Sequence, residues 1–190
     1  MDDYLKYYDS ERYLFEDVHQ RFHANHFLDA FDFFTIIIWK ANRAKSKIAR
    51  RMLKENLPGD RNLEARCRAL TQALHDAPTP KERMRVLIKE WGFALPMASA
   101  ILTVCWPDEF TVYDYRVRDL LKDLPKLTEG GDFEKTWKLF EEYKAGVIKL
   151  VPDKSLRDKD RYLSGQSRAC QLRGDIQKSF IKSDELPATH

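Results

Sequence analysis

The sequence predicts an all-α fold, a compact helical domain. Apolar residues recur at intervals of three and four through most of the 190 residues, which is the spacing of amphipathic helices. No alternating strand pattern, repeat or low-complexity tract stands out, and the extended stretch EFTVY at 109–113 is too short to require a strand. We expect one domain over 1–167, followed at 168–190 by a C-terminal helix and a frayed tail.

Apolar spacing predicts three helices before residue 78, in addition to the basic segment 40–54. Aromatic and aliphatic residues at helical spacing cover 4–22, an apolar run at 27–40 predicts a central and mostly buried helix, and leucines repeat on one face of 61–77. The clearest helix start is TPKE, in which Thr79 is the expected N-cap and Pro80 the first helical residue.

The helix that follows Thr79 should end near Trp91, because Gly92 comes next. Pro96 then opens a nearly charge-free helix that ends at WPDEF, and Asp114 heads the short helix YRVRDLL. The remaining expected elements are a turn at 127–132, a long amphipathic helix over 133–150, and a last helical segment over 153–172 after Pro152.

Composition narrows the class of protein. The chain is 43% hydrophobic with eleven Phe, eight Tyr and four Trp, which is too apolar for a disordered protein. No apolar run reaches the roughly 18 residues that span a membrane, and no secretory signal stands at the N-terminus. Three widely spaced cysteines without a CxxC indicate free thiols. We therefore expect a cytoplasmic monomer that has no membrane, metal or cofactor partner.

Charge is distributed unevenly. Residues 1–34 hold eight acids against three bases, whereas 40–54 hold seven bases and no acid. On one continuous helix, six of these bases would fall within roughly a third of the circumference. An ordinary solvated face mixes signs, so this stripe favours contact with a nucleic-acid backbone, with an acidic protein or a membrane surface as alternatives. The stripe consists of Lys40, Arg43, Lys47, Arg50, Arg51 and Lys54, and further bases follow at Arg157, Arg161, Arg168 and Arg173.

The segment GFALP, residues 92–96, joins two predicted helices in a tight hairpin. The free N–H groups and the positive dipole end of the second helix would form a seat for phosphate, although a plain buried core helix explains the same composition. Asp114 also has two compatible interpretations, as the N-cap of the next helix and as a catalytic carboxylate.

These segments resemble the helix-hairpin-helix DNA glycosylase superfamily, which includes 8-oxoguanine and adenine glycosylases. GFALPMASAIL is similar to the hairpin with its helix, and TVYDYRV to the segment with the catalytic aspartate. The similarity is closest to small bacterial members, which share four elements in this order over roughly 34–165. Here the elements are WK..R at Trp39, Lys40 and Arg43, the PMASAIL helix, the segment around Asp114, and LRDKDR with Leu156, Arg157, Asp158, Asp160 and Arg161.

The resemblance implies a monofunctional enzyme that flips a damaged or modified base out of duplex DNA and hydrolyses its N-glycosidic bond with Asp114. Pro96 stands where bifunctional relatives carry the Schiff-base lysine, and Ala94 replaces the second hairpin glycine. The implied DNA-binding residues are Lys40, Arg43, Lys47, Arg51, Lys54, Gly92, Ala94 and Arg116. The implied base-pocket walls are Trp39, Phe93 and Tyr113, with Trp91 and Trp106 as further aromatic candidates, although such aromatic residues are more often part of a plain core.

Two alternatives to an enzyme stay open. The missing lysine and altered hairpin favour a catalytically inactive nucleic-acid-binding or protein-interaction module on the same scaffold. The acidic N-terminal surface would suit a purely protein-binding role.

Three histidines offer a separate hypothesis. His19, His23 and His26 are spaced so that one helix would align their imidazoles and hold a divalent metal. A helix end near Ala24 and Asn25 would separate them instead.

Overall fold

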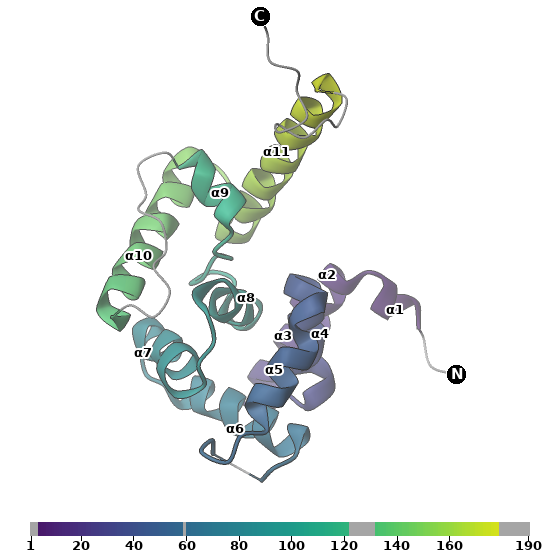
Figure 1. The fold of residues 1–190 in the computed structure, drawn as a ribbon, viewed down its shortest axis with the longest axis vertical. Helices are drawn as coiled ribbons and strands as arrows, with labels where there is room; N and C mark the ends of the chain where they lie inside the picture. Colours follow the sequence, from purple (N-terminus) through teal and green to yellow (C-terminus); the bar gives the residue numbers. More distant parts are fainter. Residues whose placement is uncertain (1–3, 59, 122–131, 179–190) are drawn as a thin grey trace, which may run out of the picture.

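The computed structural model describes residues 4–58, 60–121 and 132–178, and all regular structure among them is helical. This confirms the all-α fold class (Figure 1). The helices are α1 Leu5–Tyr8, α2 Ser10–Tyr13, α3 His19–Asn25, α4 Ala30–Ala41, α5 Lys45–Met52, α6 Leu63–Asp76, α7 Pro80–Arg85, α8 Leu95–Cys105, α9 Tyr115–Leu120, α10 Phe133–Leu150 and α11 Leu156–Gln177. Shorter helical turns lie at Leu14–Val18, Asn42–Ala44 and Val86–Glu90.

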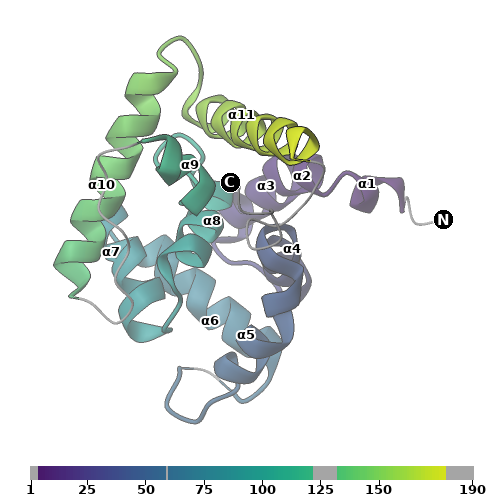
Figure 2. The same cartoon turned by 45° about the horizontal axis from the view of Figure 1, so that its top comes forward.

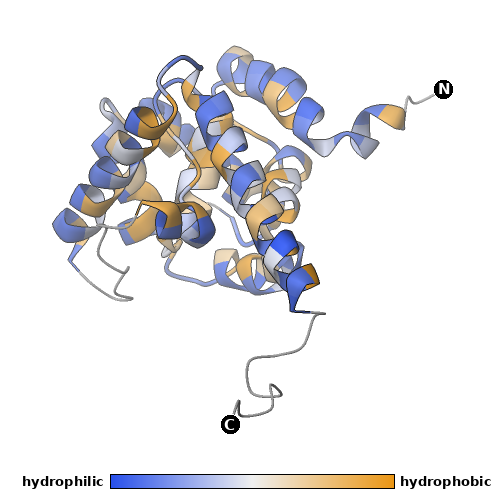
Figure 3. Cartoon of the chain, turned by 90° about the horizontal axis from the view of Figure 1, so that it is seen from above, coloured by the Kyte–Doolittle hydropathy of each residue, from blue (hydrophilic) through white to orange (hydrophobic). Residues whose placement is uncertain are grey.

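Helix α8 lies at the centre of the molecule, with the other helices around it (Figures 1 and 2). Every residue of α8 except Pro96 is buried, and the helix packs against α3, α4 and α7. This position explains its charge-free sequence, because an unpaired charge would have to give up its hydration there. The expectation of a buried core helix is therefore met. Around it, hydrophilic and hydrophobic segments alternate along most helices, as amphipathic helices require (Figure 3).

Three predicted helix boundaries are confirmed. Thr79 caps α7 by accepting a hydrogen bond from the Glu82 N–H at 3.2 Å. Gly92 adopts a φ of 69° directly after the helical turn Val86–Glu90, a conformation that L-residues adopt only at a cost. Asp114 caps α9. Only a short connection, 91–94, separates the turn Val86–Glu90 from α8.

Two predicted continuous helices are interrupted. The segment 4–22 breaks at Asp9, which ends α1 and caps α2. The basic segment 40–54 breaks at Ala41, whose φ of −161° and ψ of 81° are not helical. The turn Asn42–Ala44 offsets α5 from α4 and lets α5 bury Ile48 and Met52. The expected single stripe is therefore divided, with Lys40 on α4, Arg43 on the turn, Lys47, Arg50 and Arg51 on α5, and Lys54 beyond the end of α5.

The C-terminal part agrees with one expectation and differs from another. Helix α11 runs from Leu156 to Gln177, which covers most of the expected helical segment 153–172, but it continues without a break across the expected boundary at residue 167. Its far end projects from the body in Figure 1. The expected turn at 127–132, apart from Asp132, and the expected tail beyond 178 lie outside the described residues.

The described helices include none that is both long enough and apolar enough to cross a membrane. The three cysteines are free, as expected; Cys67 and Cys105 are buried and Cys170 is exposed.

Candidate functional site

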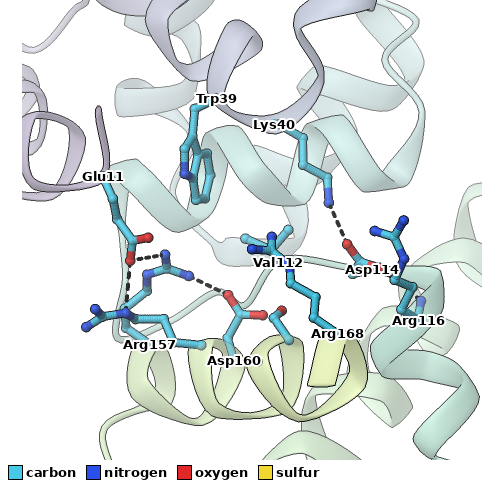
Figure 4. Close-up of a pocket in the computed structure, with 12 residues that line it drawn as sticks. Glu11, Trp39, Lys40, Val112, Asp114, Arg116, Arg157, Asp160 and Arg168 are labelled. Carbon is cyan, nitrogen blue, oxygen red and sulfur yellow. Dashed lines mark hydrogen bonds and ion pairs between the residues drawn. The ribbon is translucent and has the colours of Figure 1, made fainter. Parts of the chain in front are cut away.

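A pocket of about 310 Å³ lies where α4, the segment before α9 and α11 meet (Figure 4). Helix α4 contributes Trp39 and Lys40, and the start of α9 contributes Asp114 and Arg116. The lining residues from α11 include Arg157, Asp160, Arg161 and Arg168. Three of the four sequence elements that carry the glycosylase resemblance thus meet at this pocket.

Asp114 both caps α9 and opens onto the pocket. Its Oδ1 accepts a hydrogen bond from the Arg116 N–H at 2.9 Å, and its Oδ2 lies 3.4 Å from Lys40 Nζ. The Asp114 side chain is 24% exposed and that of Lys40 is 15% exposed. The carboxylate is therefore held at two points and is still reachable from the pocket.

Side chains of α8 and α10 hold the backbone around Asp114 by hydrogen bonds. Ser99 Oγ of α8 accepts a hydrogen bond from the Tyr113 N–H at 2.8 Å. Tyr143 of α10 is fully buried, and its hydroxyl donates to the Val112 carbonyl at 2.9 Å and accepts from the Asp114 N–H at 3.4 Å. The fourth sequence element, the α8 helix, thus contributes by fixing the segment that carries Asp114.

Arg157 organises the other side of the pocket. It donates to Asp160 Oδ2 at 2.5 Å and to Glu11 Oε1 at 2.8 Å, and its guanidinium lies 4.2 Å from the centroid of the Phe15 ring. Arg161 reaches the same Glu11 oxygen at 2.9 Å. This network ties α11 to α2 and to the helical turn that follows α2.

Asp160 is the most buried carboxylate of the pocket lining. Its side chain is 3% exposed, and Oδ1 is buried without a hydrogen-bond partner among the described residues. Burial raises the pKa of Asp160 to about 6, against the opposing effect of the nearby Arg157 and Lys40. Sequence reasoning placed Asp160 only in a shared motif, because its burial depends on how α11 packs.

The aromatic wall expected from the sequence is only partly present. Trp39 lines the pocket, but Phe93 and Tyr113 are each 2% exposed and do not. Their rings pack in the core, with centroids 6.2 Å from Phe33 and 4.8 Å from Tyr143 respectively. The other aromatic candidates, Trp91 and Trp106, also lie outside the lining. The pocket is therefore mainly charged.

Four of the eight expected DNA-binding residues lie on α5 or directly beside it, outside this pocket. Arg43, Lys47 and Lys54 are exposed there. Arg51 is partly buried and donates to the carbonyl of Gly92, which connects α5 to the segment before α8. Ala94 is the N-cap residue of α8 and makes no side-chain cap.

The three histidines do not share one helix face. His26 adopts a φ of 66° at the end of α3, and its ring stacks on His75 at 4.0 Å. His19 and His23 lie within 3.0 and 2.7 Å of the Val104 and Cys105 carbonyl oxygens at the end of α8. The metal hypothesis for this triplet was therefore wrong in its geometry, and the described residues contain no cluster of three potential ligands.

Comparison of the chain with protein-family models, curated proteins and solved structures gives no match. The glycosylase relationship accordingly stays a prediction from the sequence.

Proposed function

We propose that this protein is a monofunctional, DNA glycosylase-like hydrolase that receives a nucleotide rotated out of duplex DNA in the Asp114 pocket. The observation that carries the proposal is the position of Asp114, whose carboxylate opens onto a pocket bordered by Trp39, Lys40 and several arginines. The exposed bases of α5 supply a second cationic surface for the DNA backbone.

Hydrolysis of the N-glycosidic bond requires one well-placed carboxylate. As the base departs, positive charge develops on the sugar, and a carboxylate beside it stabilises that charge and orients the attacking water. Partial burial strengthens the effect, because the local dielectric constant is lower than in bulk water. Lys40 and the Arg116 N–H hold the Asp114 oxygens in place, so little reorganisation is needed during the reaction.

The decisive experiment uses duplexes that each carry one damaged or modified base. We expect the full chain to produce abasic sites, detected as strand breaks after alkali treatment. Asp114→Asn removes the carboxylate and should abolish this activity. Asp119→Asn is the matched control, because Asp119 is an exposed residue of α9 that pairs with Arg118. Activity that survives Asp114→Asn would refute the mechanism, and breaks formed without alkali would refute the monofunctional assignment.

A non-catalytic nucleic-acid-binding module is the second candidate. It is favoured by the ion pair with Lys40, which occupies one Asp114 oxygen, and by Trp39 being the one aromatic side chain among the described lining residues. This candidate predicts no excision on the whole base panel together with salt-sensitive DNA binding.

Salt titration tests the role of α5 under either candidate. If six bases contact phosphates, a plot of log affinity against log salt should have a slope of about −5. Replacing both Arg43 and Lys47 by glutamine should make the slope shallower by about two. Lys135→Gln on α10, also exposed, should leave it unchanged.

A further inference from the structure

The acidic side chains of the Asp114 pocket are already paired. Asp114 has Lys40 at 3.4 Å. Arg157 forms ion pairs with both Glu11, at 2.8 Å, and Asp160, at 2.5 Å. Each of the three acids among the described lining residues therefore already pairs with at least one base, and Asp160 Oδ1 is left without a hydrogen-bond partner.

Two further bases line the same pocket without an acidic partner. Within residues 4–58, 60–121 and 132–178, Arg116 and Arg168 each lack an ion pair. The Arg116 guanidinium lies 5.0 Å from the centroid of the Tyr115 ring, a contact that consumes none of its N–H donors. In Figure 4, Arg168 is drawn between Asp160 and Arg116. Both residues line the pocket from two helices, α9 and α11, that pack against each other.

We propose that Arg116 and Arg168 form an anion subsite on the open side of the pocket, and that this subsite binds a phosphate group. Two unpaired cations on one rim repel each other until an anion lies between them. Each guanidinium presents a planar fork of N–H donors that fits phosphate oxygens in pairs. A phosphate monoester offers three acceptor oxygens to the two forks, and a phosphodiester offers its two non-bridging oxygens, one to each fork.

The source of the phosphate rests on the proposed function. If the pocket receives a flipped nucleotide, the subsite holds a phosphodiester of the DNA strand and so sets the distance between the sugar and Asp114. A free nucleotide monophosphate would present the same chemistry.

The subsite is tested by isothermal titration calorimetry of the full chain with inorganic phosphate, at constant ionic strength balanced with chloride. Arg116→Gln and Arg168→Gln should each weaken phosphate binding about tenfold, as expected for loss of a charge-assisted pair, and the double variant should abolish it. Arg173→Gln is the matched control, because Arg173 is exposed on α11 and does not line the pocket. Circular dichroism melting curves that match the wild type verify the fold of each variant.

Either of two results would refute the proposed subsite. One is phosphate binding by the double variant that equals binding by the Arg173→Gln control. The other is the absence of phosphate binding by the wild-type chain in the millimolar range.

A second titration series identifies the source, using thymidine, thymidine 5′-monophosphate and a short oligodeoxynucleotide. Arginine-dependent binding of the oligonucleotide supports the phosphodiester. Arginine-dependent binding of the monophosphate alone supports the subsite and assigns it to a free nucleotide. These titrations and the excision assay test different claims. Asp114→Asn should abolish excision without lowering phosphate affinity, so the subsite and the proposed function can fail independently.

Discussion

Lys40 Nζ lies 3.4 Å from Asp114 Oδ2, and this ion pair joins the end of α4 to the head of α9 across 74 residues of sequence. Both side chains are less than one quarter exposed. Solvent therefore screens the pair less than it screens a fully exposed one, but desolvation offsets part of the attraction. The pair both positions the carboxylate and ties together two elements that form the pocket.

A double-mutant cycle of Lys40→Met and Asp114→Asn should show a coupling free energy of about 1 kcal/mol. The measurement is urea unfolding of the wild type, the two single variants and the double variant. The exposed pair of Arg12 on α2 with Glu16 on the turn Leu14–Val18 provides the control cycle and should give a smaller coupling. Additive effects of the two pocket substitutions would show that the pair contributes nothing to stability.

The features that the sequence predicted correctly are those that depend on neighbouring residues in the chain. The charge-free composition of α8, the Thr79 cap and the position of Asp114 before α9 all depend on residues close together in the chain. The tertiary neighbours of Asp114 depend on packing between distant helices. Lys40 entered the prediction through its charge and a shared motif, which gave no indication of its ion pair.

Burial of single aromatic residues could not be predicted in the same way. Helical spacing assigns Tyr143 to an apolar face, but it does not reveal that the hydroxyl meets the Val112 carbonyl. Phe93 and Tyr113 have the composition of pocket walls, and only the packed helices show that they belong to the core. The break at Ala41 is equally hidden, because alanine favours a helix and tertiary packing overrides that preference.

Tyr143→Phe should destabilise the protein by roughly 1–2 kcal/mol, because it leaves the Val112 carbonyl without its buried donor. The same change frees the backbone before α9, so we expect faster amide hydrogen exchange at residues 112–114. Urea unfolding and hydrogen exchange measure the two effects. Tyr162→Phe on α11 is the control, since Tyr162 is 52% exposed. Unchanged exchange at 112–114 would show that Tyr143 does not hold this segment.

Asp160 should make stability depend on pH. Burial raises its pKa from 3.8 to about 6 in the folded protein, so on raising the pH the unfolded chain releases this proton first. The folded state therefore loses stability between about pH 4 and pH 6, by up to about 3 kcal/mol from this group. Asp160→Asn removes the titration.

Urea unfolding of the wild type and Asp160→Asn, compared from about pH 4 to pH 7, measures this effect. The free energy of unfolding of the variant minus that of the wild type should increase as the pH rises through the window. The attraction of Arg157 for the ionised carboxylate is already part of this pKa, so the direction of the change is the readout. A difference that is constant or decreases with pH would contradict the raised pKa.

Gly92→Ala should destabilise the protein by about 1 kcal/mol, because Gly92 has a φ of 69°. Space is not the obstacle: an added Cβ would lie 3.9 Å from Arg51 Cδ, an ordinary contact. The matched control is Gly174→Ala on α11, where an added Cβ meets nothing within 4 Å. In that helix the same change should stabilise by roughly 0.5–1 kcal/mol. Urea unfolding that ranks Gly92→Ala at or above the wild type would show that the turn before α8 adopts another backbone conformation.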